Sequence, residues 1–223
     1  MNAGKIKKTE KIKAVVFDVD GVLIDTEDAY PRVVQTALLR FANVRVSKKR
    51  ILTRAGMHGV EWFTPFVAGK KNARSLAFKL FKWGDGVYFS HYLPKYGKPM
   101  PGVHATLRAL KKRGFKLAVV TNQSRNEVRI TQKIIGFNAF DAVVTASDAP
   151  PKPSPVGFRK ILKKLGVSPR EVLYVGDTVV DARLAHRVGV PLVLIHWKRN
   201  ERARELRGIP RLKRFSGLLK LVG

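Results

Sequence analysis

A chain of 223 residues with 45% hydrophobic residues is long enough for one large domain or two small ones. It contains no cysteine, which excludes disulfides, thiolate catalysis and cysteine-ligated metal sites. Its apolar runs are too short to span a bilayer, and residues 1–13 lack the apolar segment and cleavage site of a secretory signal. We therefore expect a cytoplasmic protein without membrane insertion. Composition does not predict its oligomeric state.

The charge balance is strongly basic, with 44 Lys and Arg against 16 Asp and Glu and a formal net charge of +28. Such a surface attracts an anionic substrate, or binds nucleic acid and other polyanions non-specifically. The basic residues are spread along the chain, and no nucleic-acid module with interleaved aromatics stands out. Sequence-specific recognition of nucleic acid therefore has no support.

The first predicted element is a buried strand over residues 13–19, which stops at the turn formed by Asp20 and Gly21. From residue 27 the apolar period becomes helical, and residues 26–95 carry several helical patterns with little strand alternation. A segment rich in Pro and Gly, residues 94–102, then marks a boundary. The pattern indicates a helical insert.

Strands and helices alternate after this boundary, which predicts an α/β fold: a Rossmann-like, mostly parallel sheet with helices on both faces. We expect a discontinuous core domain of residues 1–25 and 96–223, with residues 26–95 as a small α-helical domain. The tail from residue 198 is predicted to hold one or two short basic helices. The expected strands after the boundary cover residues 115–120, 142–145, 171–175 and 191–196.

Polar clusters follow several of the predicted strands directly. Because ligands bind at the carboxyl ends of the strands in open parallel sheets, these side chains can converge on one site. They are Asp18, Asp20, Thr121, Asn122, Lys152 and Asp177.

The few acidic residues are concentrated near these strand ends. Asp177 and Asp181 are four residues apart, on one face of a predicted helix start. Two carboxylates there repel each other unless a cation or Lys152 lies between them. Oxygen ligands of this kind suit Mg²⁺. Asp25 is interpreted as a hinge or helix-start residue.

Four segments resemble, in order, the motifs of the haloacid dehalogenase superfamily. Two more, PMPGVHATLRALKKRG and LAHRVGVP, resemble its phosphoglycolate phosphatase and β-phosphoglucomutase branch, in which a helical cap occupies the position of the insert. The four motif segments are FDVDGVLIDT (17–26), VVTNQS (119–124), KPSP (152–155) and GDTVVD (176–181).

The resemblance implies a role for each strand-end residue. Asp18 is the nucleophile that forms an aspartyl-phosphate, and Asp20 is the general acid and then the base. Thr121 and Asn122 bind the substrate's phosphoryl group, and Lys152 offsets the charge of the phosphate and Asp18.

The same resemblance implies a magnesium site. Mg²⁺ lies between Asp18, the Asp20 carbonyl and Asp177, with Asp181 supporting it directly or through water. The implied function is a Mg²⁺-dependent phosphatase of a small phosphorylated substrate, of the phosphoglycolate or sugar phosphate type. The alternatives are a phosphomutase, a nucleotide phosphatase and a nucleic-acid-associated binding protein.

Simpler interpretations exist for some of these residues. Thr121 or Ser124 can cap the helix that follows, and Asp177 can be an N-cap. In the insert, the aromatic residues Trp62, Phe63 and Phe66 are expected to be core. A solvated surface is expected for three polar residues that could also reach a substrate: Arg54, His58 and Lys70.

Overall fold

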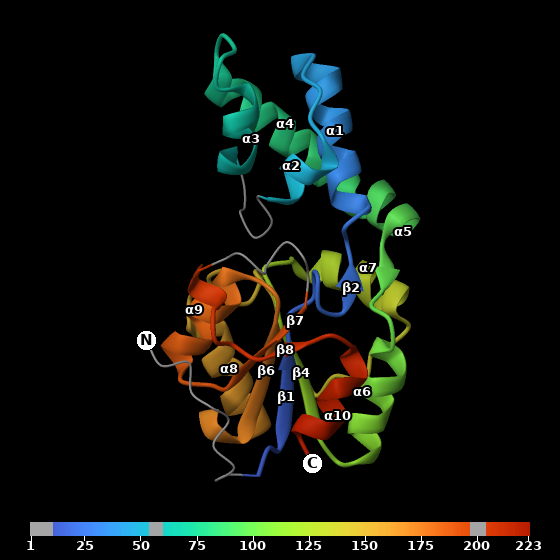
Figure 1. Cartoon of the computed structure of the whole chain (residues 1–223), viewed down its shortest axis with the longest axis vertical. Coiled ribbons are helices and arrows are strands. Elements are labelled where there is room, and N and C mark those ends of the chain that lie inside the picture. The colour runs from blue at the N-terminus through green and yellow to red at the C-terminus, as the bar shows by residue number, and fades with distance from the viewer. Residues whose placement is uncertain (1–10, 54–59, 197–203) are drawn as a thin grey trace. The chain divides into compact units, whose positions relative to one another are not determined.

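The computed structural model describes residues 11–53, 60–196 and 204–223. The chain divides into two compact units, Met1–Asp25 with Lys98–Gly223, and Thr26–Gly97 (Figure 1). Within the described residues, no helix has the length and apolar character needed to cross a membrane. The assignment of the two units as catalytic core and cap stays a prediction.

The larger unit is built on a six-stranded sheet in the order β5-β4-β1-β6-β7-β8, and every strand pair in it is parallel. The prediction of a Rossmann-like α/β fold is confirmed. The strands are β1 Ala14–Phe17, β4 Lys116–Val120, β5 Ala142–Val144, β6 Val172–Gly176, β7 Leu192–Ile195 and β8 Arg211–Leu212.

Strand β1 lies at the centre of the sheet, and its four residues are fully buried. Its last residue, Phe17, is paired with Val119 of β4 on one side and with Val175 of β6 on the other. The strand order reverses at β1, which creates the switch point where open α/β sheets bind ligands. The residue that follows β1 is Asp18, so the fold places this carboxylate at the switch point.

Helices cover both faces of the sheet (Figure 1). On one face, Phe158 and Ile161 of α8 and Leu184 of α9 pack against inward side chains of β1, β4 and β6. On the other, Phe215 stacks on Phe17 at 6.0 Å between ring centroids. The helices of this unit are α6 Val103–Lys112, α7 Arg125–Ile135, α8 Val156–Leu165, α9 Val179–Val188 and α10 Leu218–Leu221.

Two-residue strands escaped the sequence analysis because they are too short to show alternation. Strand β8 pairs with β7, and β2 Ile24–Asp25 pairs antiparallel with β3 Lys98–Pro99. The part of the predicted helical tail at residues 198–203 lies outside the described residues. In residues 204–223 the prediction is only partly right, since strand β8 and two 3₁₀ turns accompany α10. Asp25 is the last residue of β2 and does not start a helix, because the N-cap position of α1 is Asp28.

The smaller unit is helical, as predicted, and its core is aromatic. Trp62, Phe63 and Phe66 are buried, and Trp62 packs edge-on against Tyr30 at 5.1 Å. Lys70 is exposed. Arg54 and His58 lie outside the described residues. The elements of the unit are α1 Ala29–Ala42, α2 Lys48–Leu52, α3 Val60–Val67, α4 Ala73–Val87, the π-helical turn η1 Tyr88–Tyr92 and α5 Leu93–Tyr96.

Candidate active site

A buried ion-pair cluster lies at the carboxyl end of β1. Asp18 is 6% exposed, and its Oδ1 is 2.7 Å from Nζ of Lys152. The same ammonium group is 2.8 Å from Oδ1 of Asp181. Three segments that are far apart in the sequence thus meet in one cluster. We expected Lys152 or a cation between Asp177 and Asp181, but Lys152 joins Asp18 to Asp181.

Asp181 is the best-anchored member of the cluster. Its side chain is fully buried and accepts five hydrogen bonds. Oδ1 accepts from Lys152 Nζ and, at 2.6 Å, from the Tyr174 hydroxyl. Oδ2 accepts from the backbone N–H groups of Asp177 and Thr178 and from the Thr178 hydroxyl. With both oxygens engaged by donors, Asp181 is suited to position its neighbours.

The local sequence explains why Asp181 sits there. Thr178 is the N-cap of α9, and Asp181 is its partner three residues on, so the two form a capping box. Asp177, which the sequence analysis considered as a possible N-cap, therefore lies one residue before the N-cap. Gly176 is also required, because a Cβ at this position lies only 2.5 Å from Asp181 Cβ.

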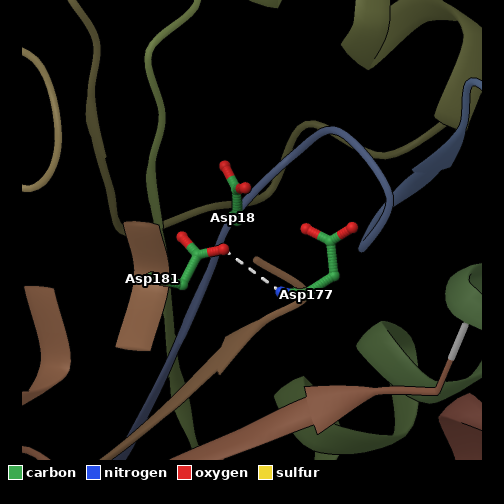
Figure 2. A group of neighbouring side chains, drawn as sticks. All are labelled: Asp18, Asp177 and Asp181. Carbon is green, nitrogen blue, oxygen red and sulfur yellow. Dashed lines mark hydrogen bonds between the residues drawn. The ribbon is translucent and has the colours of Figure 1, made fainter. Parts of the chain in front are cut away.

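Asp177 completes a group of three carboxylates. One carboxylate oxygen each from Asp18, Asp177 and Asp181 lies within 4.8 Å of the others, and all three residues are buried. Figure 2 shows the three side chains together, with the hydrogen bond from the Asp177 backbone to Asp181. Carboxylates are ligands that Mg²⁺ prefers, so the donor set suits this ion.

The pKa values of the two ion-paired carboxylates are shifted in opposite directions. Burial raises the pKa of Asp18 well above its usual value; Lys152 opposes this shift, and the charges of Asp181 and Asp177 add to it. Burial also acts against ionisation of Asp181, but Lys152 and the hydrogen bonds it receives lower its pKa. The pKa of Lys152 is raised, because the two carboxylates outweigh the effect of burial.

The segment after β4 supplies the next residues. The Thr121 hydroxyl accepts the backbone N–H of Gln123 at 3.1 Å, so its own hydrogen can be donated to another acceptor. Ser124, not Thr121, is the N-cap of α7. Thr121 lies directly after β4, and its role in binding a phosphoryl group stays a prediction.

Asn122 forms hydrogen bonds with the backbone of Lys152. Its Oδ1 accepts the backbone N–H of Lys152 at 2.6 Å, and its Nδ2 donates to the Lys152 carbonyl at 3.4 Å. The side chain thus holds the backbone that carries Lys152. The substrate-binding role that the resemblance implies for Asn122 stays a prediction.

Asp20 contacts a residue that the sequence analysis did not single out. Its Oδ2 accepts a hydrogen bond from Nε2 of Gln123 at 2.9 Å. Tyr174 and Thr178 were also not singled out. The available signals were a tyrosine inside an otherwise aliphatic strand, a threonine at a helix start, and a glutamine within a motif already recognised.

Carboxylates held with a lysine at the switch point of a parallel sheet indicate an α/β enzyme rather than a passive scaffold. Comparison with known proteins identifies the family to which this enzyme belongs. The chain belongs to the haloacid dehalogenase-like hydrolase family, whose sequence model matches residues 12–189.

Individual relatives agree with this assignment. The chain is 29% identical over 198 residues to a phosphoglycolate phosphatase of Aquifex aeolicus, covering 83% of this chain and 85% of that one. It is 29% identical over 190 residues to the pyrophosphatase PpaX of Bacillus velezensis, covering 84% and 85%. The crystal structure of a predicted phosphoglycolate phosphatase from Haemophilus somnus superposes with a TM-score of 0.81 at 26% identity, covering 96% of this chain and 100% of that one. The resemblance seen in the sequence is confirmed, and the protein is a phosphohydrolase of this family.

Proposed function

We propose that this phosphohydrolase is a Mg²⁺-dependent phosphatase of a small phosphorylated metabolite, and that it forms an aspartyl-phosphate on Asp18. The observation that carries the proposal is the Asp18 carboxylate, paired with Lys152 and grouped with Asp177 at the switch point of the sheet. The names of its relatives support phosphoglycolate and pyrophosphate as the first substrates to test. Sugar phosphates join the panel because of the resemblance noted in the sequence.

In the proposed reaction, an oxygen of Asp18 attacks phosphorus and the bond from phosphorus to the substrate oxygen breaks. The departing substrate oxygen takes a proton from Asp20. Asp20, now a carboxylate, removes a proton from the water that attacks the aspartyl-phosphate. Inorganic phosphate leaves and Asp18 is restored. Thr121 and Lys152 hold the phosphoryl oxygens during both steps.

The proposed metal ligands are Asp18, Asp177 and the backbone carbonyl of Asp20. When bound, Mg²⁺ supplies positive charge that orients the phosphoryl group and neutralises it. Asp181 supports this arrangement indirectly, because it accepts hydrogen bonds from both Lys152 Nζ and the backbone N–H of Asp177.

Phosphate release from a panel of esters, with Mg²⁺ or with EDTA, tests the proposal. We expect turnover of at least one ester with Mg²⁺, none with EDTA, and a loss of about a thousandfold or more in Asp18→Asn. Asp85→Asn is the matched control, because Asp85 is an exposed aspartate of the helical unit. Metal-independent turnover, or an active Asp18→Asn variant, would refute the mechanism. Transfer of the phosphoryl group to a second hydroxyl of a sugar phosphate, without release of phosphate, would identify a mutase instead.

A further inference from the structure

Gln123 forms a buried link between Asp20 and helix α7. Its side-chain Nε2 donates to Asp20 Oδ2 at 2.9 Å, and its Oε1 accepts the Thr131 hydroxyl at 3.1 Å. Gln123 is 4% exposed and Thr131 is 1% exposed. The link therefore connects the loop after β1, the loop after β4 and α7 through the buried side chains of Gln123 and Thr131, and ends on the partly buried Asp20.

The orientation of the Gln123 amide follows from Asp20. Oδ2 of Asp20 acts as an acceptor both when the carboxyl group is ionised and when its proton is on Oδ1, so the end of the amide that faces it is the NH₂ group. The opposite end is the carbonyl oxygen, which accepts the Thr131 hydroxyl. A rotated amide would set its carbonyl oxygen against Asp20 Oδ2 and lose that hydrogen bond.

The backbone of Gln123 is fixed as well. Its N–H donates to the Thr121 hydroxyl at 3.1 Å, and its carbonyl accepts the N–H of Ala146 at 2.9 Å. The amide thus has little freedom to follow Asp20 if that side chain rotates. It acts as a fixed donor against which Asp20 is aligned.

We propose that Gln123, braced by Thr131, is a positioning residue that sets the orientation of the Asp20 carboxyl group. The inference rests on the proposed role of Asp20 as the acid that protonates the leaving oxygen. Because Oδ2 of Asp20 is committed to Gln123, the transferred proton is carried on Oδ1. Gln123 itself touches neither substrate nor phosphorus; it keeps Oδ1 directed at the leaving group.

Dependence on the leaving group distinguishes this role from a general packing role. An alkyl phosphate needs a proton on its leaving oxygen, whereas 2,4-dinitrophenyl phosphate releases an anion that is stable without one. The change in the ratio of kcat/KM for these two substrates between wild type and variant reports on protonation of the leaving oxygen, because kcat/KM includes only the steps up to release of the leaving group. The alkyl ester is the one that the wild-type protein turns over fastest.

The test compares Gln123→Met, which keeps the length of the side chain and removes its donors, with the wild type. We expect kcat/KM to fall about tenfold or more for the alkyl ester and by no more than about twofold for the dinitrophenyl ester, since part of the usual acid catalysis is lost. Thr131→Val should show the same selective loss to a smaller extent, and Thr131→Ser, which keeps the hydroxyl, should restore the wild-type ratio.

Two outcomes overturn the inference. An equal loss on both esters indicates a packing defect, and an unchanged ratio in both Gln123→Met and Thr131→Val shows that Asp20 needs no alignment. Asp20→Asn separates these outcomes from failure of the proposed function. If Asp20→Asn selectively loses the alkyl ester and Gln123→Met does not, only the positioning role is wrong. If Asp20→Asn keeps the alkyl ester, the acid assignment itself is wrong.

Discussion

Replacing Tyr174 by Phe tests the anchoring of the buried ion-pair cluster without introducing a new charge or a large cavity. Tyr174 is fully buried in β6, and its hydroxyl donates to Asp181 Oδ1 at 2.6 Å. Its ring packs edge-on against Phe158 at 5.1 Å. Burial and the neighbouring charge of Asp181 raise the pKa of Tyr174 well above its usual value, so the hydroxyl keeps the proton that it donates.

The expected cost is about 2 kcal/mol in the free energy of unfolding. A hydrogen bond to a charged group contributes about 1.5–3 kcal/mol. Tyr174→Phe keeps the ring and its packing, so the additional cost of a cavity is small. Asp181 Oδ1 keeps its contact with Lys152, which holds the loss below the upper end of the range.

Urea unfolding followed by circular dichroism, in EDTA at neutral pH, measures this cost. Tyr92→Phe is the matched control, because the Tyr92 hydroxyl makes an exposed hydrogen bond to Thr36 at 3.0 Å. We expect that variant to lie within about 0.5 kcal/mol of the wild type, as for most surface changes. A cost for Tyr174→Phe no larger than that of the control would refute the view that Asp181 is anchored through this hydroxyl.

Three further substitutions probe the same region and the acid stability of the fold. Gly176→Ala places a Cβ 2.5 Å from Asp181 Cβ, so we expect lost turnover and a melting temperature lowered by several degrees; a variant as stable and active as the wild type would contradict the tight fit. Lys152→Met leaves two buried carboxylates without their shared ammonium, and should cost about 3–5 kcal/mol in urea unfolding in EDTA, with partial recovery on adding Mg²⁺; a cost below about 1 kcal/mol would count against the buried pair. The hydrogen bond from the Thr145 hydroxyl, against a smaller opposing effect of burial and helped by the Thr145 backbone N–H, lowers the pKa of Asp148 to about 2. This carboxylate therefore stabilises the fold above its unfolded pKa of 3.8 and loses that effect as the pH falls toward 2. Asp148→Asn should cost about 1 kcal/mol at neutral pH after allowance for solvent screening, and should flatten the fall in urea midpoint between pH 4 and 2; an unchanged acid limb would contradict the assignment.

The location of the site could be predicted from sequence because a parallel sheet has a simple geometry. Apolar runs that stop at Asp18, Thr121 and Asp177 identify strand ends, and parallel strands bring their carboxyl ends to one edge. The structure places all three residues there, after β1, β4 and β6. The helical insert was equally accessible, since its apolar period differs from that of the strands around it.

The partners of each side chain could not be predicted in the same way. Their spacing of four residues in the sequence indicates that Asp177 and Asp181 are near each other, but not which loop carries the nearest cationic side chain. In the structure, Lys152 forms ion pairs with Asp18 and Asp181. Asn122 accepts a hydrogen bond from the backbone N–H of Lys152. These contacts depend on how three separate loops approach one another, and no local pattern records that.

The two carboxylates that share the Lys152 ammonium are prepared for different tasks. Asp181 receives four further donors that fix its position. Against the effect of burial, Lys152 and then the hydroxyls of Tyr174 and Thr178 lower its pKa. Burial dominates at Asp18 and raises its pKa, so its charge is the less well compensated of the two. Pairs of acids whose environments push their pKa values apart are typical of sites where one acid reacts and the other supports. Additional positive charge, which Mg²⁺ would supply in the proposed reaction, would favour the ionised form of Asp18, the form that the proposed nucleophile requires.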